Sequence, residues 1–422
     1  MAQLRVRKFA LLSLVLVFLS SCKTFDRNSG LSNAKAGFTT ADSVQSVYAQ
    51  TTAYQQYAKE RYDQRKSLAY LVKIASYNLG LLDDRASLAT GAYVPEYDVR
   101  RNQLRRVLGK FLQDNNPHFL CLQELFYAED VSLLTEIANK NGYGIISNPS
   151  DQRETGTAIL YRKKNLKSLH LDRDFLNILR VGGPFYPDRS VIGAAFTLKT
   201  KSQDGIKVLV ASAHLSYAEG SAENNLRLEE ISKMTETLKQ EAERSHSQII
   251  LLGADFNLSP IIGDQVYKTG KGVPLEQRAI DSWQENTTGY YAFFNHMLKY
   301  NPVDTWYAAN PLSEEHQKLL VIPDQNEDRK LFGFSEDPVE SYLTKVGRTT
   351  KKEPAQRLDY IWSAVSPYTE LAKRYSSYTQ SSRLIFTEPL SDSRGESILY
   401  NKMPLHLSDH FGVMSEVIYT QE

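Results

Sequence analysis

The stretch "LLGADFNLSP", Leu251–Pro260, is the part of the sequence that says most about the fold. Its run of apolar and small residues predicts a buried strand, and this strand runs directly into Asp255 and Asn257. Residues i and i+2 of a strand point to the same face of the sheet. A buried strand that ends by placing a carboxylate and an amide on one face indicates a polar site at its end.

Strand-like and helix-like segments alternate along most of the chain. The clearest helical segments, residues 97–115 and 224–243, carry apolar residues every three to four positions with charges between them. Apolar runs typical of strands occur at residues 70–78, 118–125, 156–161, 190–198, 206–215, 248–257, 357–363 and 410–419. This alternation favours an α/β architecture in which helices cover sheets, and the chemistry of such folds gathers at strand ends.

Polar residues recur at the ends of these predicted strands. They are Asn78, Glu124, His214, Asp255, Asn257, Asp359, Asp409 and His410. Any one of them alone is more often a cap, a turn residue or a packed histidine than part of a site. The whole set, repeated at strand after strand, predicts convergence on one site.

The residue types in this set indicate the kind of metal that the site would hold. Carboxylates are hard oxygen ligands, which suit Mg²⁺ or Mn²⁺. The chain has two cysteines, and no Cys/His cluster in the sequence suggests zinc. The sequence therefore predicts a Mg²⁺ site, with Mn²⁺ as the alternative, able to grip a phosphoryl group.

Seven short motifs occur in a recognisable order: "SYN", "LQE", "GTAILYR", "SAHL", "GADFN", "RLDYI" and "LSDHFGV". This series, which runs from about Lys73 to Val417, resembles the endonuclease/exonuclease/phosphatase superfamily, also called DNase I-like. The resemblance implies a four-layer sandwich: two mixed β-sheets packed together, with helices outside. It also implies metal-dependent hydrolysis of a phosphodiester.

The resemblance implies roles for the motif residues. Glu124 matches the acid that ligates the catalytic metal, with Asn78 beside it and Asp409 as a further metal-side carboxylate. His214 matches the histidine that contacts the scissile phosphate, and Arg189 and Ser190 match loosely a basic or polar phosphate contact.

The remaining motif residues correspond to the catalytic groups of the superfamily. Asp255 matches the aspartate that aligns or deprotonates the attacking water, and Asn257 matches an amide that binds phosphate. His410 matches a histidine near the C-terminus, which Asp359 would hold in place. Either Asp255 or His410 would serve as the general base.

The first residues predict export and lipidation. Arg5, Arg7 and Lys8 precede an apolar run that is too short for a membrane span, and "LSSC" (residues 19–22) resembles a bacterial lipobox. We therefore predict a signal peptide at 1–21, lipidation of Cys22, a tether over 22–68 and a catalytic domain at 69–422. The predicted location is the bacterial cell envelope, at the outer membrane or the cell surface. Cys121, in an apolar run, is predicted to be a small buried residue.

Charge bears on the choice of substrate. Removal of residues 1–21 turns the formal net charge of +1 into −2, whereas proteins that neutralise nucleic-acid phosphates usually show a basic excess. A phospholipid substrate, as in neutral sphingomyelinases, is therefore favoured. Segments 261–301 and 308–356 are long enough to carry substrate elements. Within the first, "GYYAFFNHMLKY" (residues 289–300) would either dip into a bilayer or pack in the core.

Two alternatives remain open. A surface nuclease that takes DNA would use the same motifs, and the short basic segments 268–272 and 347–352 suit it, although they are also typical of solvated loops. A binding lipoprotein without activity would normally have lost some of the motif residues, and none is lost here. No obligate protein partner is evident from the sequence, and a monomer is expected.

Overall fold

The computed structural model describes residues 40–421 except for 83–93, 148–155, 165–168, 182–187, 199–204, 218–220, 269–270, 275–286, 320, 324–326, 338–353 and 368–374. The predicted signal peptide, Cys22, the start of the predicted tether and the basic segment 347–352 lie outside the described residues. One compact unit extends from Thr40 to Glu422.

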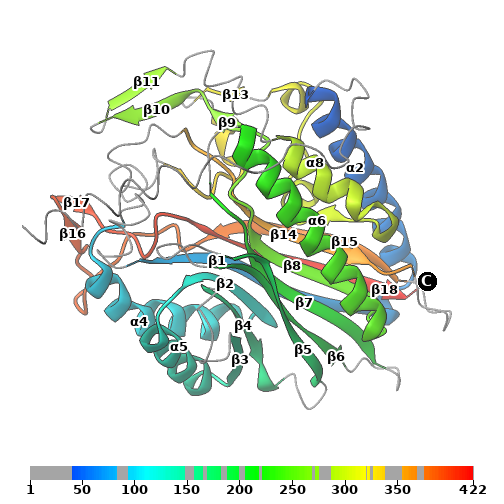
Figure 1. Cartoon of the computed structure of the whole chain (residues 1–422), viewed down its shortest axis with the longest axis horizontal. Helices are drawn as coiled ribbons and strands as arrows, with labels where there is room; N and C mark the ends of the chain where they lie inside the picture. The colour runs from blue at the N-terminus through cyan, green and yellow to red at the C-terminus, as the bar shows by residue number, and fades with distance from the viewer. Residues whose placement is uncertain are drawn as a thin grey trace, which may run out of the picture. The chain divides into compact units, whose positions relative to one another are not determined.

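Two six-stranded mixed sheets form the centre of this unit (Figure 1). The first has the order β15 (Tyr375–Ile385), β18 (Gly412–Gln421), β1 (Ala69–Leu81), β2 (Phe119–Leu125), β4 (Gly156–Arg162) and β3 (Tyr143–Ser147). The second has the order β12 (Val303–Asp304), β14 (Asp359–Val365), β8 (Ile249–Asp255), β7 (Ile206–His214), β6 (Arg189–Leu198) and β5 (Leu169–Arg180). The β1–β2 and β7–β8 pairs are parallel, and the other pairs are antiparallel.

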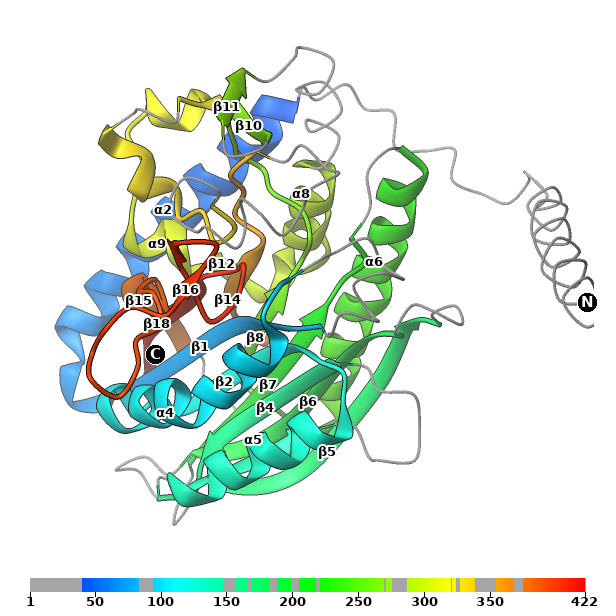
Figure 2. The same cartoon turned by 90° about the vertical axis from the view of Figure 1, so that its left-hand side faces the viewer.

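Helices cover the outer faces of the two sheets. The helices α4 (Tyr97–Asn115) and α5 (Ala128–Lys140) share a core with the first sheet, whereas α6 (Ser221–Arg244) and α8 (Thr287–His296) pack into the core of the second. Figures 1 and 2 show the strands between these two groups. The predicted four-layer sandwich of two mixed sheets is confirmed.

Short elements occupy the connections. They are η1 (Lys66–Leu68), β9 (Ile262–Gly263), β10 (Gln265–Lys268), β11 (Lys271–Pro274), η3 (Leu298–Tyr300), α9 (Thr305–Ala309), η4 (His316–Lys318), β13 (Val321–Ile322), η5 (Glu327–Phe332), β16 (Leu399–Tyr400) and β17 (Met403–Pro404). Most of them lie in the two long segments that the sequence marked as insertions.

A polar contact ties the two sheets together in the middle of the sandwich. The buried Gln123 on β2 donates from Nε2 to Ser76 Oγ in its own sheet (3.3 Å) and to Ser212 Oγ in the other (3.1 Å). Cys121 is free and buried beside it, as predicted, and burial raises the pKa of its thiol to about 12. Such a thiol is unreactive at neutral pH.

The predicted tether is wrong over residues 40–64. These residues form α2 (Thr40–Gln64), which contacts α8, α9 and β15 (Figures 1 and 2). Val47 and Tyr48 are buried in the core, and Gln55 pairs with the backbone of the edge strand β15 through the Ser377 carbonyl (3.0 Å) and the Thr379 amide (2.7 Å). The polar composition of residues 40–64 predicted a tether wrongly, because part of α2 docks through hydrogen bonds to the edge of β15 and not through large apolar side chains.

The aromatic segment 289–300 packs inside the protein. Tyr290, Phe293 and Phe294 of α8 are each no more than 2% exposed, and the rings of Tyr290 and Phe293 make tilted contacts with those of Tyr360 and Trp362. The core alternative is thus correct for these three rings, and Tyr291 is partly buried against the same core. No helix in the described part of the chain has the length and apolar character needed to cross a membrane.

His118 makes the stability of the fold depend on pH. Its Nδ1 accepts a hydrogen bond from the Lys73 amide (3.0 Å), and burial, reinforced by Arg162 and Lys73, lowers its pKa from 6.5 to about 4. Above pH 6.5 the His118 ring is neutral in both the folded and the unfolded state, so its full contribution to the free energy of unfolding is present. As pH falls from 6.5 toward 4 the unfolded chain takes up the proton first, and up to ~3 kcal/mol of stability is lost.

The test is urea unfolding of the chain and of His118→Asn at pH 7, 5.5 and 4. The asparagine oxygen can accept the same hydrogen bond but does not titrate. We expect the variant to lose less stability than the natural chain over this range. Parallel losses in the two proteins would contradict the assignment.

Candidate active site

The predicted site residues meet at one end of the two sheets. In the second sheet Ser190 pairs with His214, His214 pairs with Asp255, and Asp255 pairs with Asp359, so four neighbouring strands reach the site in register. In the first sheet, Asn78 on β1 and Glu124 on β2 lie where the register of their strands shifts. The parallel pair at the centre of each sheet delivers its carboxyl ends to the same place.

Irregularities in strand pairing orient the side chains of Asn78 and Glu124. The pairing of β1 with β2 shifts between Asn78 and Leu81, and that of β2 with β4 shifts between Leu122 and Leu125. Within the second shift, Glu124 has φ 56°, a left-handed conformation that costs a residue with a Cβ on the order of 1 kcal/mol. Bulges of this kind often re-aim side chains next to active sites.

Asp255 is held on both carboxylate oxygens. Its Oδ1 accepts from the Asn257 amide N–H (2.8 Å), and its Oδ2 accepts from Asn78 Nδ2 (2.9 Å). Burial, followed by the charge of Asp359, raises the pKa of Asp255 to about 7, against the opposing effect of His410. A carboxylate with this pKa is suited to take a proton near neutral pH.

His410 is paired with Asp359 across the two sheets. Its Nδ1 donates to Asp359 Oδ2 over 2.8 Å, and both side chains are buried. Burial opposes the charged ring, but Asp359 outweighs it and, with Asp409 and Asp255, raises the pKa of His410 well above its ordinary value. The structure thus brings Asp359 to the position that the sequence predicted for it.

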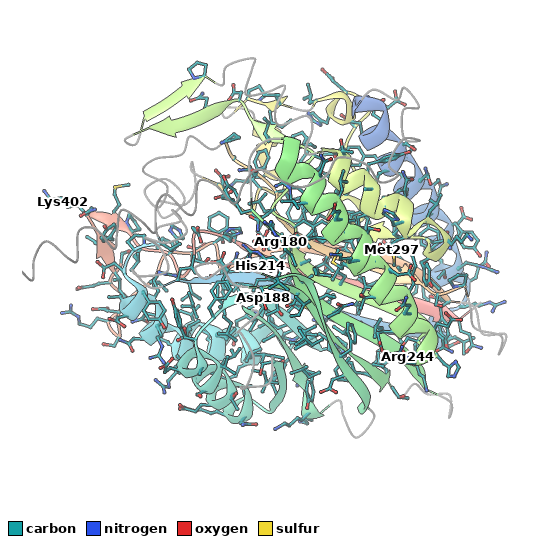
Figure 3. All side chains as sticks on the ribbon, in the orientation of Figure 1. Arg180, Asp188, His214, Arg244, Met297 and Lys402 are labelled. Carbon is teal, nitrogen blue, oxygen red and sulfur yellow. The ribbon has the colours of Figure 1, made fainter. Side chains whose placement is uncertain are left out.

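His214 faces the opposite electrostatic environment. Its Nε2 lies 3.5 Å from Asp255 Oδ2 and 3.8 Å from Glu124 Oε1, while Arg189 Nη1 lies 2.9 Å from its Nδ1. Burial, and then Arg189, lowers the pKa of His214 well below 6.5, so the ring is neutral. Figure 3 labels His214 together with Arg180 and Asp188, which come from the end of β5 and the residue before β6.

The remaining predicted residues lie in the same region with differing contacts. Asn257 has φ 49°, and its Nδ2 donates to the Leu215 carbonyl (2.9 Å). Ser190 is fully buried, with Oγ 3.2 Å from Thr157 Oγ1, so in this structure its hydroxyl contacts protein. Asn78 uses Oδ1 to accept from the Gly80 amide (2.9 Å).

Gly80 makes room for Asp409. A Cβ added at Gly80 would lie 2.7 Å from Ser408 Oγ and 2.9 Å from Asp409 Oδ1, and its φ of 58° is left-handed. We expect Gly80→Ala to displace Asp409 and to raise the divalent-metal concentration for half-maximal activity by roughly tenfold or more. Metal titration of the initial rate measures this.

Gly395→Ala is the matched control for Gly80→Ala. Gly395 has φ 84°, but an added Cβ would meet nothing within 4 Å. The control therefore carries similar backbone strain without the clash, and its metal dependence should equal that of the natural chain. An equal shift in both variants would show that strain, and not the displacement of Asp409, is responsible.

The donor set fits a divalent cation. Ligand atoms lie within 4.8 Å of one another in three groups: Glu124 with His214 and Asp255, Asp255 with Asp359 and His410, and Glu336 with Asp409 and His410. Asp359 Oδ1 is buried and has no hydrogen-bond partner. So many buried carboxylates in one place are costly unless cations offset them.

Two residues at the site were not predicted. Glu336, which is fully buried, belongs to the segment 308–356 and lies outside the seven ordered motifs. Arg100 on α4 is also fully buried, donates to the Gly80 and Leu407 carbonyls, and lies near the charge of Asp409. Its helical pattern predicted an exposed charge, and only the fold shows the burial.

Comparison with known proteins identifies the family. The model of the Endonuclease/Exonuclease/phosphatase family matches residues 75–410. The chain therefore belongs to this family of hydrolases, which act on phosphoester bonds and generally depend on a divalent metal. No curated protein matches the chain as a sequence relative.

Several solved structures are similar to this chain. An endonuclease/exonuclease/phosphatase family protein from Bacteroides thetaiotaomicron has 18% identity and a TM-score of 0.50, over 83% of this chain and 95% of its own. A mannosyl-6-phosphatase from the same species has 17% and 0.49, over 82% and 99%. TDP2 from D. rerio, complexed with a single-strand DNA product, has 16% and 0.49, over 82% and 98%. The likeness to the first of these, at a TM-score of 0.50 and 18% identity, shows a shared fold and leaves the substrate undecided.

Proposed function

We propose that the protein is a Mg²⁺-dependent phosphodiesterase in which water attacks phosphorus directly. The observation that carries this proposal is the meeting of Asp255 and the His410–Asp359 pair at one end of both sheets, beside Glu124. No serine, threonine or cysteine nucleophile is needed in this arrangement. The water oxygen forms a bond to phosphorus as one of its protons passes to Asp255, the bond to the leaving oxygen breaks, and the leaving oxygen takes up a proton from solvent.

Glu124 and Asp409, with Asn78 beside them, would hold the metal. Mn²⁺ would suit the same oxygen ligands. When bound, the cation supplies positive charge that stabilises the developing charge on the phosphoryl oxygens. Its charge would also offset the cost of burying several carboxylates together. In the protein alone, burial and then Asp409 raise the pKa of Glu124, and a bound cation would oppose that shift.

The two titrating groups take different roles. Asp255, with a pKa near 7, accepts the proton of the attacking water, and its two hydrogen bonds fix its orientation. His410 is kept protonated by Asp359, so it donates a hydrogen bond to a phosphoryl oxygen and supplies positive charge. Between the two candidates for general base, this assignment selects Asp255.

Neutral His214 and cationic Arg189 would bind the phosphate. Arg189 Nη1 already lies against the His214 ring; His214 is buried next to Asp255, and Arg189 is partly buried. A neutral imidazole donates from one nitrogen only. Arg189 therefore provides the positive charge, whereas His214 provides one directed hydrogen bond to the phosphate. Asn257 adds an amide beside them.

A phospholipid is the substrate class that we favour. The arguments are the lipobox at Cys22, which would hold the enzyme at a membrane of the cell envelope, and the absence of a basic excess in the whole sequence. The buried aromatic segment on α8 gives no support to this choice. A sphingomyelin-like headgroup is the first candidate to test.

Initial rates of the purified chain on sphingomyelin vesicles, phosphatidylcholine vesicles and linear duplex DNA, with Mg²⁺ and with EDTA, test the proposal. We expect choline phosphate release that EDTA abolishes and that Glu124→Ala lowers by a factor of at least ~10³. Glu136→Ala, an exposed acid on α5, is the control and should be fully active. Cleavage of DNA without hydrolysis of the vesicle lipids would make the protein a nuclease. Absence of activity on all three substrates would overturn the phosphodiesterase assignment for both phospholipids and DNA.

Lipidation has its own test. Metabolic labelling with a radioactive fatty acid should mark the natural chain and not Cys22→Ala. A labelled Cys22→Ala chain would contradict the predicted anchor.

A further inference from the structure

The catalytic pair Asp359–His410 joins two parts of the fold that are not neighbours in a sheet. Asp359 begins β14 in the second sheet, whereas His410 stands just before β18 in the first. The 2.8 Å hydrogen bond between them therefore depends on how the ends of the two sheets are held together.

A row of short segments holds these ends. Ile262 bridges to Gln356, Gln356 bridges to Glu336, and Glu336 bridges to His410. The middle bridge has two backbone hydrogen bonds, from the Glu336 amide to the Gln356 carbonyl (3.0 Å) and from the Gln356 amide to the Glu336 carbonyl (2.8 Å). The central segment of the row comes from the insertion 308–356.

Ser335 contacts both sides of the catalytic pair. Its Oγ accepts hydrogen bonds from the backbone amides of Leu358 and Asp359, both at 3.0 Å. Its carbonyl accepts a hydrogen bond from the amide of Phe411, the residue after His410, over 2.6 Å. Ser335 is fully buried, so water has no access that would let it take over these bonds.

We propose that Ser335 is a positioning residue for the hydrolysis, which sets the distance between Asp359 and His410. One residue uses its side chain to fix the start of β14 and its backbone to fix the segment that carries His410. A hydroxyl oxygen is required here because it can accept two hydrogen bonds and is small enough for the buried position. This inference rests on the proposed role of the Asp359–His410 pair in catalysis.

The direct test replaces the hydroxyl in the full chain and measures kcat and KM. Ser335→Ala leaves two amides at the start of β14 without their acceptor, and we expect kcat to fall by roughly 10- to 100-fold with KM little changed. Ser335→Cys keeps the volume but offers only a weak acceptor, so its kcat should lie between those of alanine and serine.

Ser363→Ala is the matched control. Ser363 lies on the same strand β14, is equally buried, and bonds Tyr419 of β18 through its Oγ (2.8 Å), so it also links the two sheets, away from the site. Both variants should lose similar stability in urea unfolding, whereas only Ser335→Ala should lose kcat. Equal losses of kcat in the two variants would show a general structural effect and overturn the proposal.

A double-mutant cycle distinguishes failure of this inference from failure of the proposed function. If Ser335 acts through His410, then Ser335→Ala should lower the residual kcat of His410→Ala by less than about twofold. If the two effects multiply, the proposal is wrong although the proposed function stands. If His410→Ala and Glu124→Ala retain full activity, the proposed function itself has failed.

Discussion

Asp255→Asn is expected to lower kcat by roughly 10³-fold, because it removes the proton acceptor from a site that is otherwise intact. Asparagine has nearly the same shape, and its oxygen can still accept the Asn257 amide hydrogen bond of 2.8 Å. KM should change little, since Asp255 acts on the attacking water. Initial rates at saturating substrate and metal measure the effect.

Asp174→Asn serves as the control for this variant. Asp174 lies on β5, where its side chain is exposed, so the same chemical change should leave kcat at the natural value. If Asp255→Asn retains more than about a tenth of the natural kcat, general-base catalysis by Asp255 is excluded. Loss of metal affinity as the main effect would instead place Asp255 among the metal ligands.

Arg357→Leu is expected to destabilise the fold by about 3 to 5 kcal/mol, because it leaves a buried carboxylate without its partner. The Arg357 guanidinium forms a bidentate pair with Asp304, with Nη1 to Oδ1 at 3.0 Å and Nη2 to Oδ2 at 2.5 Å. It lies between the rings of Tyr307 and Tyr360, at 4.1 and 4.4 Å from their centres. Urea unfolding followed by fluorescence measures the loss.

Arg105→Leu gives the comparison for an exposed pair. Arg105 and Glu136 also form two contacts, of 2.7 and 3.3 Å, but both side chains are more than half exposed. Water and salt screen such a pair, so its loss should cost no more than about 1 kcal/mol. Equal losses of unfolding free energy in the two variants would show that burial does not increase the contribution of the Arg357–Asp304 pair to stability.

The motif residues show which features of the site could be predicted from short stretches of sequence. His214 and Asp255 end their strands, Asp359 begins its strand, and these three residues pair in register in the structure. Asn257 follows Asp255 by two residues, beyond the end of β8. A strand boundary is a local property, because it depends on the change from apolar to polar residues. The ordered motifs, combined with the alternation of strands and helices, were thus enough for the fold and for the residues at the strand ends, but they missed Glu336 and Arg100.

The sequence misled, or left two alternatives open, where the surroundings of a residue and not its type decide its role. Gln55 and Arg100 are polar residues in helical segments, and both are buried by partners that are distant in the chain. The aromatic rings of α8 have the same composition whether they face lipid or the core. Nothing within a few residues of these positions distinguishes the two outcomes.

By itself, the sequence determined an α/β architecture with acidic and histidine residues at its strand ends, because both follow from periodicity and residue type over short stretches. The two-sheet sandwich followed from the resemblance of the ordered motifs to a known family. Only the tertiary structure decided that Asp255 has a raised pKa while His214 stays neutral, since these properties arise from burial and from charges on other strands. It also decided that Ser335, in a segment outside the seven ordered motifs, contacts both sides of the catalytic pair. Such contacts between distant segments depend on the complete packing of the chain.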